Sequence, residues 1–240
     1  MTTPGQPPRP LYDSPDNLGS DAFYASIGRA FVAMCAFVPV LFGIEVIDVL
    51  TGQRLQAVGG IRPHRLAGLG GVLFAPFLHD NFAHVVDNSV PLIVLGTFVL
   101  AGGTRRFLIA TGIIVLVSGL GTWLIGDPTT VVVGASGVVF GYLGALLARG
   151  VIERTWWSIV SGLLIASLYG WQIVALPSTP ARVSWQAHIF GFLGGVLAAV
   201  LLRSRRPQPP DDGSAAPGSG GTQLPPDRTR DTLALPPGHA

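Results

Sequence analysis

The stretch VVVGASGVVFGYLGALLARG, residues 131–150, is apolar enough to lie inside a membrane, yet Ser136 stands within it between Gly134 and Gly137. Two interpretations are open. Ser136 packs inside a lipid-buried helix, or it is a nucleophile at the start of one. The other polar residues within apolar runs of the chain discriminate between the two.

The composition predicts an all-α polytopic membrane protein. Of the 240 residues, 49% are hydrophobic and only 12% are charged, against about 25% charged residues in a typical soluble protein. Long apolar runs with few charges are typical of membrane-spanning helices. The formal net charge of +2 does not suggest nucleic-acid binding, and the single cysteine excludes a disulfide within the chain.

The apolar runs define a membrane domain at residues 23–203, between two Pro- and Gly-rich ends, 1–22 and 204–240, that we expect to be disordered. Six helices are predicted in this domain, at 26–50, 84–102, 107–125, 136–149, 156–176 and 184–203. The fourth is too short to cross a bilayer by itself. The connection 51–83 contains LAGLGGVLFAPFLHD, so it is expected to lie in the membrane interface or to re-enter it.

Arginine placement predicts the orientation, because cytoplasmic loops carry the excess of basic residues. One side of the predicted bundle collects Arg9, Arg29, Arg105, Arg106, Arg149, Arg154, Arg203, Arg205 and Arg206. The opposite side has Arg54, Arg62, Arg65 and Arg182. Both termini are therefore expected in the cytoplasm. The membrane is expected to be a bacterial plasma membrane, since no organellar targeting segment is seen.

Polar side chains recur at one depth of the predicted bundle, and such residues are functional candidates in a membrane. Ser136 precedes Arg149 by 13 residues, His188 precedes Arg203 by 15 and Asn88 precedes Arg105 by 17. At 1.5 Å per residue these separations are about 20, 22 and 26 Å. The three residues thus reach a level roughly 4–10 Å below the outer edge of a hydrocarbon core about 30 Å thick. A shared site explains this agreement better than scattered packing residues do.

The residue types at this level indicate nucleophilic catalysis. A serine hydroxyl needs an adjacent base, and His188 is a candidate at the right depth. Because Ser136 opens its helix, backbone N–H groups there are free to face an oxyanion. His84 and Asn88, at i and i+4, share one helix face, and both can donate hydrogen bonds to the oxyanion. Asp87 points about 100° away, toward another helix, and we hypothesise a structural or tuning role for it.

Glycines provide the space that such a site needs. Gly134 and Gly137 allow a sharp turn around Ser136. Small residues at four-residue spacing also allow close helix contact in membranes. The fourth helix has Gly137, Gly141 and Gly144, and the sixth has Gly191 and Gly195. Phe140, one turn after the serine, is expected to pack against the ring of His188.

Three motifs together resemble the rhomboid intramembrane serine proteases. They are HDNFAHVVDN (79–88), GASGVVFGYLG (134–144) and AHIFGFLGG (187–195), and the resemblance covers roughly residues 60–203. It implies a six-helix bundle whose short fourth helix starts at the nucleophile, and a Ser136–His188 dyad without a third acid. His84, Asn88 and the Ser136 backbone N–H would bind the oxyanion, beside the turn at Gly134.

The resemblance also implies partners and access. Substrates would be single-span membrane proteins cut in or near their spans, and neither a metal nor another cofactor would be needed. Water would enter from the outer side through a cavity that the loop 177–184 covers. The family often has a Trp-Arg pair in the first outer loop, whereas PHRLAGL (63–69) has Arg65 without a tryptophan. This departure leaves the anchoring of the loop open.

Two other functions compete with a peptidase. A catalytically silent relative that binds membrane proteins would be marked by loss of Ser136 or His188, and both are present. A small transporter would explain polar residues inside the membrane, but it predicts broken helices in paired repeats, and no repeat is evident. The sequence gives no indication of the oligomeric state.

Overall fold

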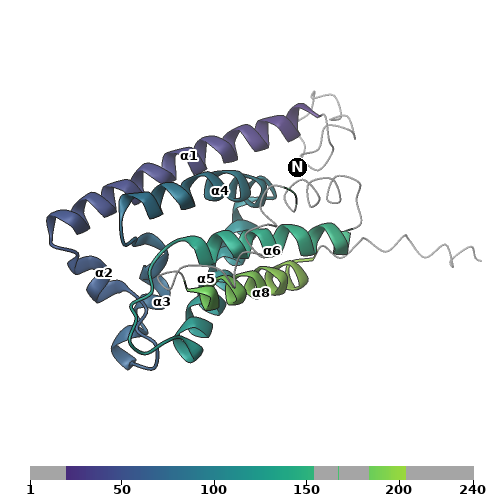
Figure 1. The fold of residues 1–240 in the computed structure, drawn as a ribbon. Helices are drawn as coiled ribbons and strands as arrows, with labels where there is room; N and C mark the ends of the chain where they lie inside the picture. The colour runs from purple at the N-terminus through teal and green to yellow at the C-terminus, as the bar shows by residue number, and fades with distance from the viewer. Residues whose placement is uncertain (1–19, 154–166, 168–183, 204–240) are drawn as a thin grey trace, which may run out of the picture. The chain divides into compact units, whose positions relative to one another are not determined.

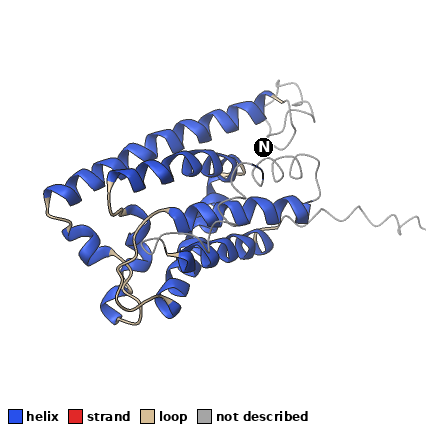
Figure 2. Cartoon of the chain, viewed as in Figure 1, coloured by secondary structure: helices blue, strands red, loops and turns tan. Residues whose placement is uncertain are grey.

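The described part of the protein is helical. The computed structural model describes residues 20–153, 167 and 184–203, where helices are joined by loops without a strand (Figure 2). The helices are α1 (Asp21–Leu50), α2 (Arg54–Gly59), η1 (Leu66–Gly68), α3 (Gly71–Phe74), η2 (Ala75–Phe77), α4 (Phe82–Ala101), α5 (Thr104–Ile125), α6 (Ser136–Glu153) and α8 (Trp185–Leu201).

The predicted helices at 26–50, 84–102, 107–125, 136–149 and 184–203 are found, with corrected ends. Three begin earlier than predicted, because polar or glycine residues before the apolar runs cap or open them. Ser20 caps α1 and Asn81 caps α4, each accepting a backbone N–H three residues on, and Gly103 precedes α5. The fourth helix is longer than predicted, since it continues to Glu153.

Four predictions fall outside the described residues, apart from a few positions at their edges. They are the helix 156–176, the covering loop 177–184 and the disordered ends 1–22 and 204–240. They stay predictions.

Helix α6 has the central place in the packing (Figure 1). It contacts α4, α5 and α8, while α1 lies along α4. The hydrophobic core gathers side chains from these helices, among them Leu41, Leu95, Ile114 and Leu143, all at most 1% exposed. Helix α6 is therefore held by three neighbouring helices.

The outer faces of the helices have the character expected in lipid. Three helices, α1, α4 and α5, are long and apolar enough to cross a membrane, and α6 and α8 are apolar but shorter. Large apolar side chains remain exposed along them, including Val40, Val86, Val90, Leu116, Leu120, Leu193 and Leu197. Soluble monomers rarely expose apolar patches of this extent, so the chain is an integral membrane protein.

The first loop, residues 51–83, folds into α2, η1, α3 and η2, and α3 packs against α5. Trp123 of α5 contacts this loop, and its Nε1–H donates to the carbonyl of Arg65 at 2.9 Å. The N–H of His64 donates to the carbonyl of Trp123 at 3.1 Å. The loop is thus anchored by a different residue from the one that the family pattern suggests.

Candidate active site

Ser136 is the first residue of α6, as predicted. Gly134, two residues earlier, has φ of +120°, a conformation that residues with a Cβ rarely adopt. The carbonyl of Ala135 accepts the N–H groups of Val138 and Val139 at 2.9 and 3.0 Å. The N–H groups of Ser136 and Gly137, which come before them, have no acceptor within the helix. A nucleophile at this position therefore has backbone donors beside it.

His79 contacts the turn before the serine, although the sequence analysis did not single it out. Its Nε2 accepts the Ala135 N–H at 3.5 Å, a long and weak hydrogen bond, and its side chain is buried. Burial lowers the pKa of His79 to about 4; nearby His84 acts in the same direction and Asp80 opposes it. The ring is therefore neutral at pH 7, with its proton on Nδ1.

His188 stacks on Phe140, as predicted. The two ring centroids lie 4.2 Å apart with the planes 10° from parallel, and His188 is 5% exposed. Neither ring nitrogen has a hydrogen-bond partner among the described residues, so the expected bond to Ser136 is not formed here. Such catalytic hydrogen bonds are often long in the absence of substrate and tighten when it binds.

The predicted close contact between the fourth and sixth helices is confirmed. A Cβ built on Gly191 would collide with the carbonyl of Gly137, and one built on Gly195 with the carbonyl of Gly141. Gly144 meets the carbonyl of Phe192 in the same way. The backbones of α6 and α8 touch without intervening side chains, which brings His188 to the first turns of α6.

Ser118 of α5 joins this contact from a third helix. Its hydroxyl donates to the carbonyl of Ala187 at 2.9 Å, and a Cβ on Gly137 would collide with the same hydroxyl oxygen. Ala187 directly precedes His188, and Ser184 caps α8 by accepting the Ala187 N–H at 3.3 Å. The start of α8 is therefore fixed by two hydrogen bonds, one to the carbonyl and one from the N–H of Ala187.

His84 and Gly134 are brought together, as the site prediction requires. A Cβ built on Gly134 would lie 2.6 Å from Cε1 and 2.9 Å from Nε2 of His84. Ser136, His84, Gly134 and Gly137 line an open pocket with an empty volume of about 490 Å³. The wall of this pocket also includes residues of the first loop and of α5 and α8, among them Pro76, Ser118, Ser184 and Ala187.

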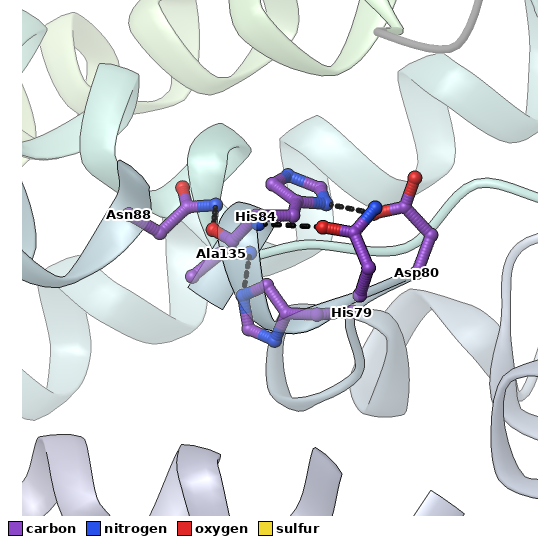
Figure 3. Close-up of polar contacts among 6 residues, drawn as sticks. His79, Asp80, His84, Asn88 and Ala135 are labelled. Carbon is purple, nitrogen blue, oxygen red and sulfur yellow. Dashed lines mark hydrogen bonds and ion pairs between the residues drawn. The ribbon is translucent and has the colours of Figure 1, made fainter. Parts of the chain in front are cut away.

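Asn88 and Asp87 lie differently from what the sequence suggested. Asn88 is buried, but its Nδ2–H donates to the carbonyl of His84 at 2.8 Å (Figure 3), and it does not line the pocket. The expectation that Asp87 faces another helix is wrong, because its side chain is exposed. Adjacent residues of a helix differ by about 100° in direction, which turns Asp87 off the buried face that carries Asn88.

Asp80, Asn81, His79 and Ser118 surround the site without having been predicted. The first three precede α4 and lie outside the six predicted helices, whose polar residues were ranked by depth. A signal did exist for Asp80, since it stands four residues before His84, the spacing at which helical side chains meet. Ser118 carried no such signal, because buried serines are common in membrane helices.

Comparison with known proteins shows the family to which the chain belongs. The model of the Rhomboid domain matches residues 67–205, which include the first-loop helices α3 and η2, the turn at Ser136 and all of α8. The chain belongs to the rhomboid family. The fold expected from the three motifs, an all-α membrane bundle, is confirmed.

Several relatives of this rhomboid protein are bacterial. An uncharacterised protein of Mycobacterium tuberculosis is 46% identical over 175 residues, covering 69% of this chain and 72% of that protein. One from Mycobacterium leprae is 38% identical over 180 residues, covering 71% and 70%. Bacillus subtilis YdcA, whose name places it provisionally among the rhomboid proteases, is 26% identical over 160 residues, covering 66% and 76%.

Proposed function

We propose that this rhomboid protein is an intramembrane serine endopeptidase with Ser136 as nucleophile and His188 as general base. The observation that carries the proposal is the position of Ser136 at the start of α6, on the wall of an open pocket that it shares with His84. His188, stacked on Phe140 one turn further along α6, supports the pairing.

In the acylation step, Ser136 Oγ attacks the carbonyl carbon of the scissile peptide bond while a nitrogen of His188 takes the hydroxyl proton. The carbonyl oxygen becomes an oxyanion. The Ser136 N–H and the His84 ring are the proposed donors to it, since both residues line the pocket. Collapse of this intermediate breaks the C–N bond, and His188 returns the proton to the leaving amine.

Deacylation repeats the sequence with water. A water molecule enters through the open pocket and gives a proton to His188 as it attacks the acyl-serine. The second oxyanion then collapses, Ser136 regains its proton and the new carboxyl end is released. No metal or other cofactor enters these steps.

The proposed substrates are single-span membrane proteins, because the pocket lies among apolar helices whose outer faces are suited to lipid. Helix-destabilising residues in a substrate would assist, since an extended backbone must reach Ser136. The bacterial relatives support a bacterial plasma membrane, and the arginine distribution supports cytoplasmic termini.

The test is co-expression with a tagged single-span substrate. Wild type should release a cleaved fragment, and Ser136→Ala should not. Ser89→Ala is the matched control, since Ser89 is a buried helical serine whose hydroxyl donates to the carbonyl of its own helix at Val85, 2.6 Å away. Ser89→Ala should cleave as wild type does. Equal cleavage by wild type and Ser136→Ala would end the proposal.

A catalytically silent rhomboid that binds membrane clients is the second candidate. It is favoured by one observation, the absence of a hydrogen-bond partner for His188 among the described residues. A serine-directed fluorophosphonate probe separates the two functions without a substrate. Labelling of wild type but not of Ser136→Ala would support the peptidase, and labelling of neither would support the silent protein.

A further inference from the structure

Asp80 and His84 form a close pair at the start of α4. Asp80 Oδ1 lies 2.6 Å from His84 Nδ1, and the two side chains are 34% and 23% exposed (Figure 3). A separation this short is typical of a hydrogen bond to a charged group. Asp80 therefore accepts the Nδ1–H of His84.

Two further contacts hold His84 by its backbone. Asn81 Oδ1 accepts the His84 N–H at 2.9 Å, and Asn88 Nδ2–H donates to the His84 carbonyl at 2.8 Å. With Nδ1 engaged by Asp80, the remaining polar atom of His84 is Nε2. This is the nitrogen beside Gly134, where a built Cβ would lie 2.9 Å away.

The identity of the exposed nitrogen matters for binding an oxyanion. A histidine that carries its only proton on Nδ1 presents a lone pair at Nε2, which repels an oxyanion. In the imidazolium form both nitrogens donate, and an adjacent carboxylate stabilises that positive charge. With Asp80 as the acceptor at Nδ1, such a ring keeps Nε2–H for the oxyanion.

Other ionisable groups face this pair from neighbouring elements. Glu45 of α1 interacts electrostatically with both Asp80 and His84. The ring of His79 meets that of His84 edge-on at 5.1 Å between centroids, and His188 of α8 interacts electrostatically with His84. Among these groups, Asp80 is the one hydrogen-bonded to His84.

We propose that Asp80 is a positioning residue for the oxyanion donor His84, holding the ring so that Nε2–H faces the substrate carbonyl at Ser136. The inference rests on the proposed peptidase function. Its structural rival is an ordinary i,i+4 ion pair at a helix start, which would stabilise the fold without affecting chemistry.

The experiment compares substituted full-length proteins in lipid vesicles with a single-span substrate. Asp80→Asn should lower kcat by at least tenfold and change KM by less than about twofold. Loss of a whole oxyanion donor, about 100- to 1000-fold, sets the upper limit. Asp80→Glu, which keeps the charge, should lie between wild type and Asp80→Asn. Asp87→Asn makes the same change at an exposed carboxylate of α4 and should match wild type.

A second background separates positioning from structure. In a His84→Ala protein, Asp80→Asn should cause no additional loss of kcat, because the residue through which it acts is gone. An equal loss in both backgrounds, or a wild-type kcat for Asp80→Asn, overturns the inference. If Asp80→Asn does not fold, the kcat of Asp80→Glu still decides. It must be lower than the kcat of both wild type and Asp87→Asn.

Ser136→Ala in the same assay keeps the two proposals apart. If Ser136→Ala cleaves as wild type does, the peptidase function itself fails. If Ser136→Ala is inactive while Asp80→Asn is fully active, only the role of Asp80 fails.

Discussion

Replacing Gly134 by alanine should lower kcat about a hundredfold with little change in KM. The new Cβ would stand 2.6 Å from His84 Cε1, whereas carbon atoms in contact are about 3.5–4.0 Å apart. The ring must therefore withdraw by about 1 Å, the difference between roughly 3.5 Å and the built distance. A displacement of about 1 Å at a reacting group costs on the order of a hundredfold in rate.

The same substitution also strains the backbone. At φ of +120° an alanine is disfavoured, and conformations of this kind cost about 1–3 kcal/mol. The variant should therefore unfold at a lower temperature than wild type. Native domains have about 5–15 kcal/mol of stability, so the variant should still fold, and its kcat can be measured.

The assay measures kcat and KM for a single-span substrate in vesicles, with thermal unfolding measured on the same preparations. Gly112→Ala is the matched control, because Gly112 is exposed on α5 and a Cβ there meets nothing within 4 Å. A folded Gly134→Ala protein with kcat within twofold of wild type would refute the reasoning. It would mean that His84 does not act at the reacting carbonyl.

Three further predictions concern stability. Gly195→Ala should destabilise the protein by about 1–3 kcal/mol, the usual cost of overpacking, because its Cβ meets the carbonyl of Gly141; thermal unfolding measures this. Stability should also fall as pH drops from 6.5 to about 4, because unfolded His79 takes up a proton before folded His79 does. The loss is at most about 3 kcal/mol, and unfolding of His79→Gln should depend less on pH in this range. Trp123→Phe removes the hydrogen bond to Arg65, worth about 1 kcal/mol, and should speed hydrogen exchange in the first loop.

The helices and the glycine contact could be predicted because they depend on local patterns. Apolar runs and spacing are enough to locate α4, α5, α6 and α8 to within a few residues at most ends. The stacking of Phe140 on His188 followed from a one-turn offset on α6. These features need only the geometry of single helices and the smallness of glycine.

The surroundings of His84 could not be predicted in the same way. The prediction compared the depths of polar residues within the predicted helices. Asp80 and His79 lie in the segment before α4, so the comparison did not include them. The Asn88 amide can donate either to a carbonyl of its own helix or into the pocket. The spacing of residues in the sequence does not decide between the two. Trp123 reached Arg65 across 58 residues of sequence, a contact that only the folded loop reveals.

The first loop is hydrogen-bonded directly to the segment that leads into Ser136. Ile61 and Val132 exchange backbone hydrogen bonds at 2.9 Å, and the Gly134 N–H donates to the carbonyl of Ala75 at 2.9 Å. Residues 61–75 and 132–134 are therefore expected to change together between related proteins. A chimera that takes α6 and its preceding turn from another rhomboid should retain its active geometry only if the donor's first loop is transferred with them.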